Sequence, residues 1–486
     1  MVIDRRQLLR ASLGTIAGAL ATAFPVHALQ ASAAAARSGA TALRPIGPIS
    51  PKRDLRDGRT RLALPDGWAY RSFGATGDRM ADGVATPGRQ DGMAAFDGPG
   101  GTIRVARNHE ERESGTPIGD AAKAYDGNTI AGTTILEIDP VTRELRRDWV
   151  SLNGTNFNCA GGTTPWGTWL SAEETVNGPD VGPDFAGNGP DFEQPHGFIF
   201  EVDPRWGLGA HPKAKPIRKA GRFPHEACSI DPRTGILYQT EDQFLFPGGI
   251  YRYRTDENPM TAGRLLDGGT LEMMRVRGSS EPAVLGGVLT QGDTFDIDWV
   301  VIGEPDPSFS ASAPPPNDEA IRHVSLQGFA KNAAKFGRPE GCWFADGFLW
   351  FTCTRGGSTD AALNESPEGE YGDGHGQVWR YGPAAEQLTL VFQSTDPAVL
   401  DLPDNMTISP AGNVVLCEDG AEGNFIRSLG TDGTMTDIAQ NVTERPDEEF
   451  AGVCFSPDGR TIFVNIQAAS GITFAIWRPG DDAPLL

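Results

Sequence analysis

The chain has 486 residues, with 61 glycines and 37 prolines, and its 42 basic and 64 acidic side chains give a net charge of −22. This length allows two or three ordinary domains or one large β domain, and the glycine and proline content indicates many turns. The negative charge argues against a nucleic-acid partner, and it repels anionic substrates unless bound cations reverse the local charge.

The first residues have the order of an export signal. Arg5 and Arg6 precede a modestly apolar run rich in alanine and glycine, and small residues follow at 31–33. We therefore expect a twin-arginine signal over residues 1–33, read by the twin-arginine translocation machinery, and a flexible leader over residues 34–50. A disordered basic leader is the alternative. The apolar run is too short for a stable membrane anchor, so the mature protein is expected to be periplasmic or secreted.

From residue 51 onward strand patterns dominate, and one hairpin unit repeats six times. Each copy has a polar or glycine-containing start, a strand, a turn, a second strand and a polar end. The copies begin at Asp91, Asn156, His225, Arg338, Asp404 and Phe450, and they end at Glu111, Glu174, Asp242, Thr354, Asp419 and Gln467. Six hairpins predict an all-β fold, a six-bladed β-propeller in one domain over residues 51–486. An array of β-sandwiches is the alternative. Residues 267–325 and 177–194 are expected as irregular loop insertions.

In a propeller the innermost strands line one axial channel, so the polar ends of the repeats are expected to meet at one mouth. The converging candidates are Asp91, Glu110, Cys159, Glu173, Glu174, Glu226, Glu241, Glu340, Asp404 and Glu418. So many carboxylates cannot stay ionised together without cations. Oxygen ligands suit calcium, and a cysteine thiolate with glutamates suits a transition metal such as iron.

The six cysteines show no CxxC spacing, which argues against a zinc ribbon. Most lie inside apolar strand patterns, where they are expected to be small core residues, and disulfides remain possible after export. Cys159 differs because it stands at the start of a repeat hairpin, where other copies carry a carboxylate. A buried structural cysteine beside a solvated acidic turn is the alternative interpretation of this stretch.

Several motifs resemble the PhoX family of alkaline phosphatases. The most specific is the cysteine and Glu-Glu segment with its TPWGTW spacer, NCAGGTTPWGTWLSAEE at Asn158. The other matching segments span nearly all of the mature chain: DGM at Asp91, NHEE at Asn108, QPHGFIFEVDP at Gln194, GRFPHEA at Gly221, YQTED at Tyr238, RPEG at Arg338, PDNM at Pro403, CEDG at Cys417 and EFAGVCFSPDGRTIFVNIQ at Glu449. The chain looks like the shorter, compact branch of the family, which lacks insertions of longer members.

The resemblance implies an exported phosphomonoesterase with Fe(III) and Ca²⁺ ions in the mouth of the channel. Cys159 would be an iron ligand, and the further metal ligands carried over by motif are Glu173, Glu174, Glu226 and Glu340. Arg338 would clamp the phosphate group, since a planar guanidinium pairs with two phosphate oxygens.

Asp91, Glu110, Glu241, Asp404 and Glu418 are metal candidates from the repeat geometry alone. The histidines His109, His196 and His225 are expected to orient ligands or support structure instead of binding metal.

Two other functions stay open. A calcium-dependent lactonase or ester hydrolase propeller would use Asp404 and Asn405, but a single calcium ion needs no thiolate from Cys159. A periplasmic propeller that only binds partners would use ions as structural links. No GxSxG motif is present, which argues against a serine hydrolase of that type. We expect small phosphoester substrates, no nucleic acid and a monomer.

Overall fold

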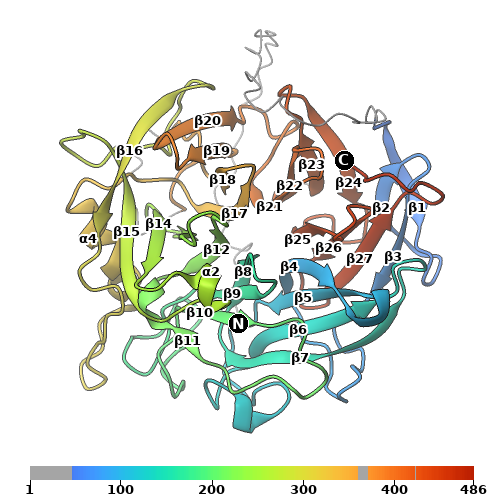
Figure 1. The fold of residues 1–486 in the computed structure, drawn as a ribbon, viewed down its shortest axis with the longest axis horizontal. Helices are drawn as coiled ribbons and strands as arrows, with labels where there is room; N and C mark the ends of the chain where they lie inside the picture. Colours follow the sequence, from blue (N-terminus) through green and yellow to red (C-terminus); the bar gives the residue numbers. More distant parts are fainter. Residues whose placement is uncertain (1–45, 360–369, 422) are drawn as a thin grey trace.

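The protein is an all-β propeller with six blades around a central axis (Figure 1). The computed structural model describes residues 46–359, 370–421 and 423–486. The predicted export signal, and the predicted leader as far as residue 45, lie outside these ranges. Hydrogen bonds group the strands into five sheets, because two neighbouring blades share one nine-stranded sheet. The predicted propeller is thus confirmed.

Each blade is an antiparallel meander whose first strand lies nearest the axis (Figure 1). Blade A contains β4 (Gln90–Asp97), β5 (Ile103–His109), β6 (Ala131–Ile138) and β7 (Leu145–Thr155). Blade B contains β8 (Asn158–Thr163), β9 (Trp169–Glu173), β10 (Ile199–Val202) and β11 (Pro216–Ile217). Blade C contains β12 (His225–Ile230), β13 (Leu237–Glu241), β14 (Ile250–Thr255) and β15 (Gly269–Val276).

The remaining blades follow the same order. Blade D contains β17 (Pro339–Ala345), β18 (Phe348–Cys353), β19 (Gln377–Gly382) and β20 (Gln387–Gln393). Blade E contains β21 (Pro403–Ile408), β22 (Val414–Glu418), β23 (Phe425–Leu429) and β24 (Met435–Asn441). Blade F contains β25 (Phe450–Phe455), β26 (Thr461–Ile466), β27 (Ile472–Trp477) and, as its outer strand, β3 (Ala69–Phe73) from the start of the chain. The first strands of the six blades contact one another in a closed ring.

The ring of blades closes through the pairing of β27 with β3, which joins the two ends of the described chain. Two further early strands, β1 (Ile49–Arg53) and β2 (Thr60–Pro65), extend blade E, where β2 pairs with β24. Residues 49 and 50, which were expected in the leader, therefore belong to a sheet. The buried Asp54 ties these strands together, because it accepts hydrogen bonds from Ser72 at 2.5 Å and Arg61 at 2.6 Å.

The region expected as an insertion over residues 267–325 contains two strands. One is β15, the outer strand of blade C, and the other is β16 (Thr294–Val301), which links β15 to β20 and so joins blades C and D. The short helices α3 (Asn317–Ala320) and α4 (His323–Phe329) follow it, and the other helical turns are α2 (Pro259–Ala262), η1 (Pro99–Gly101), η2 (Ala121–Lys123) and η3 (Arg218–Ala220). No helix within the described ranges is long and apolar enough to span a membrane.

Apolar side chains from facing blades form the core. Between blades A and B, for example, the fully buried Trp149 and Phe198 pack with Trp169. Complete burial of one such side chain contributes roughly 1.5–3 kcal/mol. All six cysteines are buried and free of disulfides, which agrees with a core role for most of them.

Every innermost strand carries a β-bulge at the same place. In each pairing with the second strand, two residues of the first strand lie opposite one residue of the second. These bulge pairs are Asp91-Gly92, Cys159-Ala160, Glu226-Ala227, Glu340-Gly341, Asp404-Asn405 and Gly452-Val453. A bulge interrupts the alternation of side chains and re-aims them, so the same position of each blade is turned toward the axis.

The bulge of blade A brings two neighbouring inner strands so close that Gly92 has no room for a side chain. A Cβ atom built on Gly92 would lie 2.5 Å from the Cα atom of Ala160, which holds the same place in the next blade. We expect Gly92→Ala to lower the free energy of unfolding by about 1–3 kcal/mol, because the two strands must move apart. Chemical denaturation of both proteins measures the difference.

Gly207→Ala is the matched control. Its added Cβ atom would meet no atom within 4 Å, and no left-handed backbone is recorded there. We expect its stability to stay within about 0.5 kcal/mol of the unsubstituted protein. Equal stability of the two variants would contradict the close packing of the inner strands.

Candidate metal centre

The bulges place acidic side chains and one thiol in a continuous cluster. Four groups have ligand atoms that all lie within 4.8 Å of one another: Asp91, Glu110 and Cys159; Cys159, Glu174 and Glu226; Glu226, Glu340 and Asp404; Asp404, Asp419 and Glu449. Consecutive groups share one member, so the four form a single chain of possible cation sites. Its members come from blades A to E and from the connection that precedes blade F.

Cys159 lies at the junction of the first two groups. Its Sγ atom is 3.3 Å from Oδ2 of Asp91 and 3.2 Å from Oε1 of Glu226. These partners occupy the equivalent bulge position in the blades on either side. The alternative interpretation, in which Cys159 is an ordinary core cysteine, does not account for these two carboxylate neighbours.

Without bound cations, burial has the largest effect on the pKa values of this cluster. Burial, with the nearby carboxylates of Asp91 and Glu226, raises the pKa of the Cys159 thiol well above its ordinary value. Burial and Glu110 raise the pKa of Asp91 to about 8, and burial and Glu340 raise the pKa of Glu226 well above its ordinary value. Bound cations act in the opposite sense, because they stabilise the ionised forms.

In blades A, B and E, the residue that follows the last paired position of the second strand also belongs to a candidate ligand group. In blade B, Asn158 pairs with Glu173, and the next residue, Glu174, joins the cluster. The same holds for Glu110 after the pair of Gln90 with His109, and for Asp419 after the pair of Pro403 with Glu418. Successive side chains of a strand point to opposite sides, so only one carboxylate of each adjacent pair can enter the channel.

Glu173 is the neighbour that points away, although the sequence suggested it as a ligand. Its carboxylate accepts hydrogen bonds from His196 Nδ1 at 2.7 Å and from the backbone N–H groups of Asn156 at 2.9 Å, Gly197 at 2.8 Å and Phe198 at 3.0 Å. Four donors occupy its lone pairs. Glu173 therefore anchors the connection between β9 and β10.

Glu241 and Glu418 are also predicted ligands that the structure keeps out of the four groups. Glu241 accepts hydrogen bonds from Gln243 Nε2 at 2.9 Å and from the hydroxyl of Tyr251 at 2.8 Å, and burial raises its pKa to about 7. Glu418 accepts from Arg427 Nε at 2.8 Å and from the N–H of Phe425 at 3.0 Å. Burial raises the pKa of Glu418 to about 7 despite Arg427. Both carboxylates tie a loop to their own blade.

Arg338, the predicted phosphate clamp, is buried and held by three carboxylates. Its guanidinium donates to Asp242 at 2.7 Å and Glu370 at 2.8 Å, and it lies 2.7 Å from Glu340. Glu340 belongs to the third ligand group. The backbone of Arg338 is left-handed, with φ at +52°, a conformation that costs energy in non-glycine residues and often marks functional sites. These contacts fix the guanidinium beside the cluster.

The three histidines lie outside the four ligand groups. His196 is buried between Glu173 and Asp126, whose Oδ2 atom is 3.3 Å from its Nε2 atom. Burial alone would lower the pKa of His196, but the two carboxylates outweigh it and raise the pKa to about 9. Burial lowers the pKa of His225 to about 4 and that of His109 well below its ordinary value. The structure thus places all three in supporting positions.

Sequence reasoning missed Asp419, Glu449, Asp242 and Glu370 as parts of this region. Asp242 and Asp419 directly follow Glu241 and Glu418, so the alternation of strand side chains was the available signal. Glu449 precedes the first strand of blade F, and Glu370 lies in the long connection between β18 and β19. Neither position follows from the hairpin repeat.

The donor set fits hard cations together with one softer metal. The four groups contain eight carboxylates and the thiol of Cys159. Carboxylates suit calcium, whereas a thiolate next to carboxylates suits a transition metal. Two donor atoms, Oδ1 of Asp91 and Oε2 of Glu226, are buried without a hydrogen-bond partner, which is costly unless a cation occupies the site.

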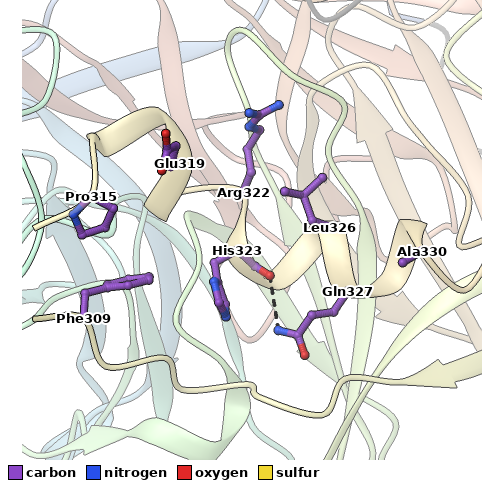
Figure 2. Close-up of a pocket in the computed structure, with 8 residues that line it drawn as sticks. All are labelled: Phe309, Pro315, Glu319, Arg322, His323, Leu326, Gln327 and Ala330. Atoms are coloured by element: carbon purple, nitrogen blue, oxygen red, sulfur yellow. Dashed lines mark hydrogen bonds between the residues drawn. The ribbon is translucent and has the colours of Figure 1, made fainter.

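A separate surface pocket of about 540 Å³ lies on helix α4, where Phe309 and Leu326 line it with His323 and Gln327 (Figure 2). None of its lining residues belongs to the four ligand groups. Its side chains bind each other or nearby loops, as in the contact of His323 with Glu304 at 2.9 Å. We therefore do not assign the chemistry of the protein to this pocket.

Comparison with solved structures shows the same fold in a PhoX protein. Pseudomonas fluorescens PhoX, in complex with the transition state analogue vanadate, has a TM-score of 0.66 and 18% identity over 90% of this chain and 98% of that chain. A gluconolactonase from Xanthomonas campestris reaches a TM-score of only 0.35 at 12% identity, over 90% of this chain and 99% of its own. Virginiamycin B lyase from Staphylococcus aureus reaches 0.38 at 12% identity, over 84% and 99%. At these TM-scores, the two structures support no inference about the fold or function of this chain.

No curated protein matches the chain. The family model described as "Alkaline phosphatase PhoX" matches residues 45–470, a range that includes blades A to E, the strands β25, β26 and β3 of blade F, and all four ligand groups. The chain therefore belongs to the PhoX family of alkaline phosphatases, whose members are phosphomonoester hydrolases.

Proposed function

We propose that this protein is an exported phosphatase that hydrolyses small phosphomonoesters at an iron and calcium centre in the mouth of the propeller channel. The observation that carries the proposal is the position of Cys159 between Asp91 and Glu226, inside a chain of four ligand groups. A purely structural calcium site does not need a thiol at such a junction. Release of phosphate from p-nitrophenyl phosphate by the purified protein tests the activity.

The ligand groups divide into two chemical kinds. The groups that contain Cys159 would hold iron, and the groups made only of carboxylates, from Glu226 to Glu449, would hold calcium. Bound cations would offset the phosphoryl charge and activate the attacking oxygen. The protein's own contribution is to fix the donors on rigid strands, since five of them stand on bulges of the inner ring.

Arg338 supplies the positive charge that comes from the protein itself. Asp242 and Glu370 hold its guanidinium in one orientation next to Glu340. A planar guanidinium can pair with two phosphate oxygens and stabilise the charge that develops on them once the phosphate displaces one of these carboxylates. In this proposal Arg338 orients the phosphate at the third ligand group.

The proposal includes export of the protein by the twin-arginine route. Residues 1–33 carry the arginine pair, the apolar run and the small residues of a twin-arginine signal. That route carries folded proteins, so the centre could be loaded before export. Fusion of residues 1–33 to a reporter protein, with and without replacement of Arg5 and Arg6 by lysine, tests the route.

Chelation of calcium is expected to abolish phosphatase activity and lower the melting temperature together. The reason is that the carboxylates of the mouth lose the cations that offset their mutual repulsion. The measurement combines phosphate release, thermal melting and elemental analysis in excess chelator. An unchanged melting temperature after proven loss of metal would contradict a structural role for the ions.

Replacement of Cys159 by serine is expected to remove iron, because a hydroxyl that stays protonated is a poor substitute for a thiolate. Visible absorbance from a thiolate-to-iron bond should fall with it, whereas calcium held only by carboxylates should stay. Elemental analysis and visible spectra measure both.

Cys228→Ala is the control for Cys159→Ser, since Cys228 is buried in the core between blades and belongs to none of the four groups. It should keep its iron and its colour. Full iron content in Cys159→Ser would show that Cys159 is a structural cysteine.

Replacement of Arg338 by alanine is expected to lower kcat/KM by roughly 10²–10³-fold, the usual effect of losing one charge-stabilising donor. Arg338→Lys should recover only part of the activity, because an ammonium group lacks the bidentate geometry. Iron and calcium should largely remain bound. Loss of iron from Arg338→Ala would contradict the phosphate-clamp role.

Arg427→Lys is the matched control for the loss of buried ion pairs. Arg427 is as buried as Arg338 and pairs with Glu418 and Asp437, neither of which belongs to a ligand group. The Arg427→Lys variant should have a lower free energy of unfolding, without a comparable loss of kcat/KM.

A further inference from the structure

An arginine held between two aromatic rings lies beside the first ligand group. The Cζ atom of Arg112 is 4.2 Å from the ring centroid of Phe157 and 5.6 Å from that of Phe185. Its NH2 group lies 3.4 Å from Oε1 of Glu110, a member of that group. We call these residues, Phe157, Arg112 and Phe185, the Arg112 stack.

The strand order places the Arg112 stack at the mouth of the channel. Strand β9 ends at Glu173, directly before the ligand Glu174, so the connection over residues 174–198 leaves from the mouth. Phe185 lies in this connection. Arg112 follows Glu110 by two residues in the corresponding connection of blade A. Both residues therefore reach the mouth from neighbouring blades.

Phe157 is fixed in a strained conformation between two ligand segments. Its backbone is left-handed, with φ at +54°. Its N–H donates to the carbonyl of Glu111 at 2.8 Å, and its carbonyl accepts from the N–H of Glu174 at 2.9 Å. Strain of this kind persists where the surroundings hold it and is common at functional sites. The ring of Phe157 is thus a rigid support for Arg112.

Two features of the Arg112 stack leave room for a ligand: an unpaired nitrogen and an exposed ring. The Nε atom of Arg112 is buried and makes no hydrogen bond. Phe185 is 69% exposed, the one exposed phenylalanine among the described residues. An exposed aromatic ring beside the candidate metal groups gains free energy when it stacks on an apolar ligand group.

We propose that the Arg112 stack is a subsite for the organic group of the substrate and that it favours phosphomonoesters of planar aromatic alcohols. The exposed face of Phe185 would stack on the aromatic group of the substrate, and Arg112 would hold the Phe185 ring in place. The inference rests on the proposed function: with the phosphate at the third ligand group, the organic group would extend along the chain of groups toward Glu110.

The test compares one aromatic and one aliphatic ester in the metal-loaded enzyme. Phe185→Ala is expected to raise KM for p-nitrophenyl phosphate about three- to tenfold, the range of one aromatic contact, and to leave KM for glycerol 2-phosphate within about twofold. Comparison of variant with parent for each ester cancels the difference in leaving-group chemistry. Phe185→Trp should restore the preference, because it keeps an aromatic face.

Leu208→Ala is the control, since Leu208 is 47% exposed but lies in the connection that follows β10, at the opposite end of the blade from the mouth. It should change neither KM. An equal rise in KM for both esters in Phe185→Ala, or no rise for either, would overturn the subsite.

Binding of non-hydrolysable analogues separates this inference from the phosphatase proposal. Phenylphosphonate should bind the unsubstituted protein several-fold more tightly than methylphosphonate, and Phe185→Ala should remove that difference. Turnover of glycerol 2-phosphate by the unsubstituted protein tests the activity by itself. Equal binding of the two phosphonates would overturn the subsite even in an active enzyme.

Discussion

Buried negative charge at the channel mouth is the constraint on which this structure depends. Carboxylates and a thiol that are removed from water and crowded together repel one another, and an uncompensated buried charge costs several kcal/mol. The protein side chains alone respond by taking up protons, as the raised pKa values of Asp91 and Cys159 show. The arrangement therefore has full ionic character only with cations present. The stability of the fold and the binding of cations therefore depend on each other.

The scaffold meets the constraint with two sets of carboxylates. In blades B and E, one carboxylate after the second strand joins the cluster, and the carboxylate one residue earlier holds a loop of the same blade. Glu173 shows the second role best, since it fixes the connection after β9 through backbone N–H groups and His196. Asp126 accepts from the far side of the same imidazole and also from the backbone N–H groups of residues 193 and 194. Preorganised ligands reduce the rearrangement needed when ions bind.

The fold and much of the site could be read from the sequence because the repeat is local. A hairpin brings its own start and end together, so Asp91, Cys159, Glu226, Glu340 and Asp404 could be identified as equivalent before any blade was seen. The choice within an adjacent pair could not be made in this way. Whether Glu173 or Glu174 enters the channel depends on the pairing register, and a shift of one residue reverses the answer.

Other features depend on contacts between distant segments. The closing strand β3 pairs with β27 across most of the chain length, and β16 joins two blades into one sheet. The partners of Arg338 come from two separate connections and from strand β17. None of these contacts repeats along the chain, so no periodic pattern in the sequence predicts them. Patterns that recur six times could be predicted, and arrangements that occur once could not.

The bulge of blade F differs from the other five, because its first residue is a glycine. Gly452 stands where the other five blades present a carboxylate or a thiol, and its φ is +70°. A Cβ atom there would lie 2.3 Å from the carbonyl oxygen of Asp91, so no side chain can enter. The bulge residues with donor side chains therefore form an incomplete ring, and a substitution at Gly452 alone cannot complete it. A side chain at position 452 would require a change of the backbone at Asp91, which is itself a member of the first candidate ligand group.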